Sequence, residues 1–187
     1  MGAAPSTLRI STELTLPGIA IGLGTGLVAG GLAALGGLPL SYVALTTLAL
    51  GVPLAVMGAG YDALLASGRI RLGGVAPAML YWIPAFPLAR LFHEVTLDIG
   101  AGRSVVLPEA LPSFLTFQAI MSVGYAIGFL WLHENVAGLW WVRVRDHNPV
   151  AARYVGQYTQ QAAVMERSKK PKDRAQPRTK AEGDKPG

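Results

Sequence analysis

The sequence predicts an all-α integral membrane protein, a bundle of four transmembrane helices with both termini in the cytoplasm. Hydrophobic residues make up 51% of the 187 residues and charged residues only 14%, whereas a soluble domain carries about 25% charged residues. The charges are also unevenly spread, because Asp62 is the only one between Pro17 and Ser67, and half of the Lys and Arg residues lie from Arg167 onward. The body of the chain therefore lacks the polar surface that a soluble protein needs.

Four apolar segments are long enough to cross a bilayer, which takes about 20 residues of helix. Residues 1–15 form a predicted N-terminal cytoplasmic segment, and residues 16–142 form the transmembrane domain. Within it the predicted spans cover about residues 16–38, 42–66, 72–92 and 114–135. The end of the fourth span is left open as far as Val142. A turn at residues 36–39 (GGLP) and another at residues 67–71 (SGRIR) separate the first three spans, as expected between helices.

The distribution of Lys and Arg predicts the orientation. Positive residues gather in cytoplasmic loops, and four spans place both termini and the second connection on one side. That side holds the basic tail and most of the remaining arginines: Arg9, Arg69, Arg71, Arg143, Arg145 and Arg153. The Ala-, Gly- and Leu-rich composition is typical of a high-GC bacterium, so we expect a multi-pass protein of the plasma membrane, with an organelle inner membrane as the alternative.

Two segments follow the last span. Residues 143–164 place Val150, Tyr154 and Tyr158 at helical spacing, which predicts a short amphipathic juxtamembrane helix on the membrane surface or on a partner. Residues 165–187 are polar and basic with Pro and Gly, and they predict a disordered tail that binds anionic lipid headgroups. A basic tail on a neutral body does not indicate nucleic-acid binding, which needs a charged folded face.

The first span carries glycine at every fourth position in the run GIAIGLGTGLVAGG. Small residues four apart line one helix face and allow another backbone to approach closely, as in a glycine zipper. We predict that this face packs against the second span or against another subunit. The residues of the helix-packing face are Gly18, Gly22, Gly26 and Gly30.

Two other functions of the glycine run are disfavoured. Gly24–Ala29 fits the G-x-G-x-x-A dinucleotide pattern, but that pattern is meaningful only between a strand and a helix, and it expects an acidic residue about 20 positions later. A cleaved signal peptide is disfavoured too, because Glu13 offsets the single positive charge of Arg9 and the glycines make a poor hydrophobic region.

Ionisable residues near the cytoplasmic ends of the second and fourth spans form the first candidate site. Asp62, His133 and Glu134 would lie at the same end of the bundle, and such groups inside a membrane are costly and often functional. The simplest role for Asp62 is an interfacial ion pair with Arg69 or Arg71. The alternative is a proton or cation site.

A second candidate cluster lies at the end of the third span, on the outer side. Arg90, His93, Glu94 and Asp98 recur at helical spacing, which predicts one polar helix face. His93 and His133 should lie near opposite faces of the membrane, so we expect no shared metal site. The chain has no cysteine, and we expect no metal and no cofactor.

The sequence favours a non-catalytic accessory or assembly subunit of a larger membrane complex, in contact with lipid and with other subunits through the glycine-lined face, as a hetero- or homo-oligomer. Two alternatives stay open. One is a small transporter or channel with an inner polar site around Asp62. The other is a membrane enzyme or cofactor holder that uses His93 or His133, although no catalytic motif is present.

Overall fold

The computed structural model describes residues 7–104 and 110–174, and α-helix is the only regular secondary structure in this part of the chain. The first four of its helices are long and apolar enough to cross a membrane, which confirms the predicted all-helical class. The helices are α1 (Thr7–Leu35), α2 (Leu40–Ala66), α3 (Val75–Gly100), α4 (Leu111–Val144) and α5 (Pro149–Arg174).

Several predicted boundaries differ from the structure. Residues 7–15, predicted as part of an N-terminal cytoplasmic segment, belong to α1. The third span was expected to end near Phe92, but α3 continues to Gly100 because the polar residues beyond Phe92 are compatible with a helix. The fourth helix continues to Val144, two residues beyond Val142, the furthest end that was left open for the fourth span. The tail predicted from residue 165 is helical as far as Arg174. The remainder of that tail, and the first six residues of the predicted N-terminal segment, lie outside the described residues.

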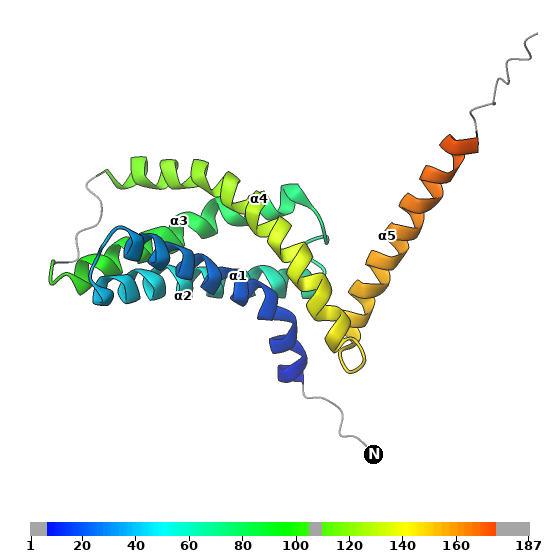
Figure 1. The fold of residues 1–187 in the computed structure, drawn as a ribbon, viewed down its shortest axis with the longest axis horizontal. Helices are drawn as coiled ribbons and strands as arrows, with labels where there is room; N and C mark the ends of the chain where they lie inside the picture. Colours follow the sequence, from blue (N-terminus) through cyan, green and yellow to red (C-terminus); the bar gives the residue numbers. More distant parts are fainter. Residues whose placement is uncertain (1–6, 105–109, 175–187) are drawn as a thin grey trace, which may run out of the picture.

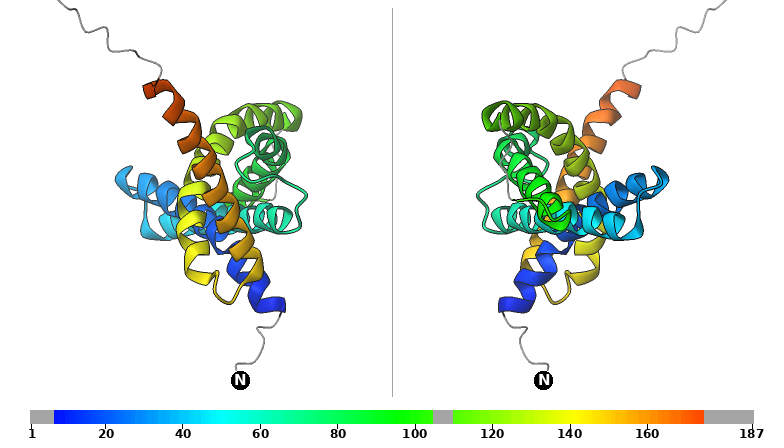
Figure 2. Two further views of the ribbon diagram at one scale, coloured as in Figure 1. Left: turned by 90° about the vertical axis from the view of Figure 1, so that its right-hand side faces the viewer. Right: turned by 90° about the vertical axis from the view of Figure 1, so that its left-hand side faces the viewer.

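Helices α1, α2, α3 and α4 each run antiparallel to the next one along the chain (Figure 1). We name the two ends of the bundle by what lies there. The tail end contains the start of α1, the α2–α3 connection and the junction between α4 and α5. The loop end contains the α1–α2 turn and the end of α3. Helix α5 leaves the tail end at an angle to the bundle (Figures 1 and 2).

Helices α1 and α2 are in backbone contact along the glycine-lined face. A Cβ atom added to Gly18, Gly22 or Gly26 would lie within 3.0 Å of backbone atoms of α2, at Gly58, Ala55 and Gly51 respectively. A Cβ on Gly30 would overlap the side chain of Thr47. This face is therefore occupied by α2 within the chain, and α2 contributes two glycines of its own.

The centre of the bundle is aromatic. Trp82 on α3 packs against Tyr125 and Phe129 on α4, with ring centroids 4.7 and 4.6 Å away. Tyr61 on α2 contacts the edge of Phe129 at 5.3 Å, and Trp82 and Tyr61 are both fully buried. These rings fill the space between α2, α3 and α4. Tyr61 and Phe129 also contact the ring of His133.

Helix α5 is attached to the bundle by its first turns. Asn148 precedes it, and the side-chain Oδ1 of Asn148 accepts hydrogen bonds from the backbone N–H groups of Val150 and Ala151 at 3.2 Å. Such caps satisfy the free donors at a helix start. Tyr154 stacks on Trp141 of α4 at 4.8 Å, and its hydroxyl donates to the carbonyl of Leu65 in α2.

Candidate functional site

The site begins at Pro17, which lies inside α1 and has no backbone N–H. The missing donor frees the carbonyl of Glu13 four residues earlier and bends the helix, and α1 changes direction in its N-terminal third (Figure 1). The indole Nε1 of Trp140 on α4 donates to the freed Glu13 carbonyl at 2.7 Å. A side chain from another helix thus supplies the hydrogen bond that the proline removes.

Asp62 binds to α1 at the next residue after the proline. The backbone N–H of Gly18 donates to Oδ2 of Asp62 at 2.8 Å. A Cβ on Gly18 would lie 2.7 Å from this oxygen, so the absence of a side chain leaves room for the carboxylate. Gly18 therefore serves both the close contact with Gly58 and the approach of Asp62.

The second oxygen of Asp62 faces His133 on α4. Nε2 of His133 lies 2.5 Å from Oδ1 of Asp62, and the two side chains are each only 1% exposed. The residues are 71 positions apart in sequence. Asp62 thereby joins α1, α2 and α4 at one point, and we call Gly18, Asp62 and His133 the inner network.

Aromatic rings enclose the inner network. The ring of His133 stacks on Phe129, contacts the edge of Tyr61, and lies 5.8 Å from Trp141. Rings on these sides exclude water from the pair, and a buried charged pair is stable only with good geometry and further hydrogen bonds. The Gly18 N–H supplies one of them.

The other residues predicted for this end lie elsewhere. Glu134 is half-buried and lies beside the α2–α3 connection, where its Oε1 would be 3.0 Å from a Cβ on Gly73. Arg69 and Arg71 are exposed. The expected interfacial ion pair with Asp62 is wrong, because the carboxylate is 2% exposed and faces His133 instead.

A polar cluster at the start of α1 was missed from the sequence. Both carboxylate oxygens of Glu13 lie 3.1 Å from Nε2 of His147, and the Asn148 amide donates to the same group at 3.3 Å. These residues are more than 130 positions apart, so no local spacing connects them.

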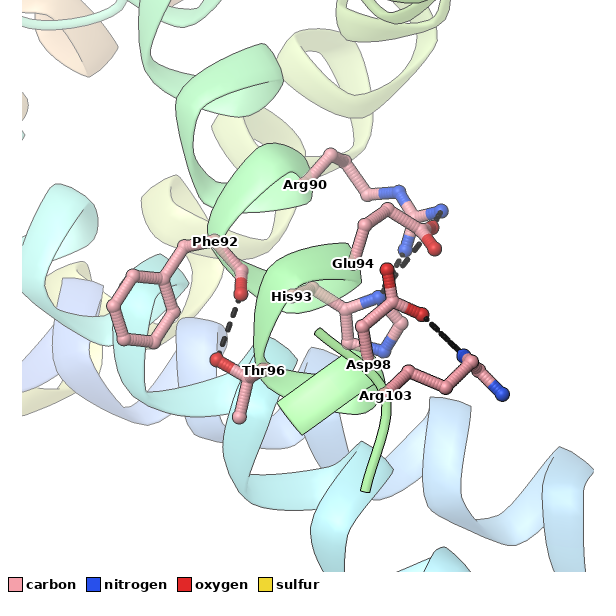
Figure 3. Close-up of polar contacts among 7 residues, drawn as sticks. All are labelled: Arg90, Phe92, His93, Glu94, Thr96, Asp98 and Arg103. Carbon is pink, nitrogen blue, oxygen red and sulfur yellow. Dashed lines mark hydrogen bonds and ion pairs between the residues drawn. The ribbon is translucent and has the colours of Figure 1, made fainter. Parts of the chain in front are cut away.

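The outer cluster forms within α3 and the turn after it (Figure 3). Nη2 of Arg90 lies 2.6 Å from Oε1 of Glu94, and Nη1 lies 2.7 Å from Nδ1 of His93. Asp98 joins neither group and pairs instead with Arg103 at 2.6 Å. The predicted residues therefore form two separate ion pairs, and Arg103 is an addition that spacing along one helix could not indicate.

The two histidines lie in different clusters. His93 contacts Arg90 and Glu94 of its own helix, whereas His133 contacts Asp62 of α2. Among the residues that the structure describes, no group of three or more His, Asp or Glu side chains could hold a metal ion. The arrangement can hold a proton or an ion pair at Asp62 and His133, and it ties three helices together.

Comparison of the chain with protein-family models, with curated proteins and with solved structures gave no match.

Proposed function

We propose that this protein is a non-catalytic accessory or assembly subunit of a larger membrane complex. In this role α1–α4 anchor the chain in the bilayer and α5 contacts other subunits. The glycine-lined face packs against α2, so the proposal assigns the intermolecular contact to a different surface from the one that the sequence favoured.

The observation that carries this proposal is the position of α5. Its first turns pack on the bundle, where Ala151 and Tyr154 are buried, and its second half projects away from α1–α4 (Figures 1 and 2). Val164 in this half is 66% exposed. It lines a groove of about 400 Å³ with Gln157, Gln160 and Met165 along one side of the helix. Isolated helices are marginal in water, and a partner that covers this side would stabilise α5.

Charge supports the orientation that goes with this proposal. The tail end carries Arg69, Arg71, Arg143 and Arg145, and positive residues favour the cytoplasmic side. We therefore place both termini in the cytoplasm of a plasma membrane protein of bacterial type. Helix α5 would meet its partner at the cytoplasmic surface, where the basic tail also reaches anionic headgroups.

Affinity purification of the full chain from its native membrane in a mild detergent tests the proposal. Val164→Asp places a charge on the exposed apolar side of α5, and we expect co-purifying subunits to be lost. Ala162→Asp is the matched control, since residue 162 is exposed on the opposite side of the same helix. Equal recovery of the same partners with both variants, or purification of the wild type alone, would contradict the accessory role.

The inner network supports a second candidate, a small transporter or channel with an inner polar site. Asp62 and His133 are ionisable groups buried inside a helical bundle, and such groups commonly mark proton or ion pathways. Purified protein in liposomes would then show a proton-linked flux that Asp62→Asn abolishes and Asp98→Asn leaves unchanged. If the protein is only an accessory subunit, the wild type, Asp62→Asn and Asp98→Asn should all give no flux.

A further inference from the structure

A cavity of about 480 Å³ lies at the tail end, between the α2–α3 connection and the first turns of α5. Its walls are of two kinds. Leu65, Ile70 and Leu72 give it an apolar side, and the polar side holds two arginines, Arg71 from the connection and Arg153 from α5. These two cationic side chains are 82 positions apart in sequence, and they line the same cavity because the first turns of α5 lie beside the end of α2.

Both arginines are available to an anion. Each is exposed, and the ion pairs of the described residues involve neither of them. The residues that line the cavity include no Asp or Glu. Arg153 is positioned by Tyr154, since its guanidinium carbon lies 5.5 Å from the centre of that ring. Arginine presents a planar set of donors that matches the oxygens of a phosphate group.

The neighbouring helix end does not oppose an anion strongly. Carbonyl groups at the end of a helix repel negative charge, but the Leu65 carbonyl of α2 already accepts from the Tyr154 hydroxyl and from the Gly68 N–H. Burial raises the pKa of Tyr154 above its ordinary value, so the hydroxyl stays a neutral donor. The anion would therefore meet a capped carbonyl and two guanidinium groups that form no ion pair among the described residues.

The position of the cavity favours the phosphate group of a membrane lipid over a free phosphate ion. The cavity begins at Leu65 and Ala66, the last residues of a helix that is long and apolar enough to span a membrane. This is the depth at which the headgroups of the cytoplasmic leaflet lie in the orientation proposed above. The aliphatic wall is suited to the glycerol and upper acyl chain of a lipid, whereas a free phosphate ion would leave it empty.

We propose that this cavity binds the phosphate group of an anionic phospholipid, held by Arg71 and Arg153, and that the bound lipid fixes the angle between α5 and the bundle. The site is separate from the basic tail and does not depend on the accessory role of the protein.

Native mass spectrometry of the full chain in detergent, titrated with phosphatidylglycerol or with phosphatidylcholine, tests the site. We expect the wild type to retain phosphatidylglycerol preferentially. R71Q/R153Q should weaken its retention by about tenfold or more, because hydrogen bonds between charged groups are among the strongest in proteins. R143Q/R145Q removes the same charge from the same end outside the cavity, and it should bind as the wild type does.

Three outcomes would overturn the proposal. The first is equal loss of phosphatidylglycerol in both double variants, which would indicate attraction to net charge alone. The second is unchanged binding in R71Q/R153Q. The third is displacement of the lipid by inorganic phosphate at comparable concentration, which would identify a soluble ligand instead. R71K/R153K, which keeps the charges but loses the planar donors, should bind more weakly than the wild type.

Discussion

The dipeptide His-Glu occurs twice in this chain and has a different role each time. At the loop end, His93 and Glu94 contact Arg90 of their own helix. At the tail end, His133 contacts Asp62 of another helix, and Glu134 points to a different region. The outer cluster is local and partly exposed, whereas the inner network is buried and joins three helices.

The difference shows that the packing around a dipeptide decides its role. The absence of a side chain at Gly18 creates the space that Asp62 occupies, and the Gly18 N–H donates to the carboxylate. The outer cluster needs only helical spacing, and pairs of that kind stabilise a helix weakly. Substitutions at the two ends should therefore differ in cost.

The largest effect is expected at the close contact between the backbones of α1 and α2. Gly22→Leu places a large side chain where even a Cβ would overlap the backbone of Ala55. We expect a loss of more than about 3 kcal/mol of stability, because overpacking here separates α1 from α2. Unfolding in mixed micelles with increasing SDS measures it. Gly24→Leu is the control, since Gly24 faces open space, and an equal loss in both variants would contradict the packing account.

Asp62→Ala should have the next largest effect. It leaves His133 and the Gly18 N–H buried without their acceptor, and breaking a buried pair costs about 3 kcal/mol. Asp98→Ala is the matched change in the outer region, where the partner Arg103 is 64% exposed, and we expect a loss below about 1 kcal/mol. Thermal unfolding in detergent compares the two. Similar losses would remove the distinction between the inner and outer regions.

Trp140→Phe should have a smaller effect, because it removes one hydrogen bond at the kink and keeps the ring. The Glu13 carbonyl then loses its donor, at a cost of about 1 kcal/mol. In a Pro17→Ala background the new N–H of residue 17 can bond to the same carbonyl, so the Trp140→Phe penalty should shrink. The same unfolding assay detects this, and an unchanged penalty would mean that Pro17 does not expose the carbonyl.

Glu94→Gln should have the smallest effect. It weakens an ion pair between side chains that are 23% and 38% exposed, and such pairs contribute about 0.5 kcal/mol or less. The thermal unfolding midpoint should move only slightly. A loss as large as that of Asp62→Ala would show that the outer cluster is part of the core.

The four-helix class was predictable because apolar length and charge distribution are local properties of the sequence. The spacing of Arg90 and Glu94 likewise predicted a shared helix face. The partner of Asp62 was not predictable, because it depends on the register between α2 and α4, which the aromatic core sets. The contact between Glu13 and His147 and the cavity beside Arg153 were missed for the same reason, since both form only when distant segments fold together.

A double-mutant cycle on Asp62 and His133 tests most directly whether the inner network holds the bundle together. The stabilities of Asp62→Ala, His133→Ala and the double variant are compared with that of the wild type in the SDS unfolding assay. We expect a coupling energy of about 2 kcal/mol or more, as found for side chains that share one polar network. Strictly additive losses would contradict the account, because they would show that the two residues stabilise the protein independently.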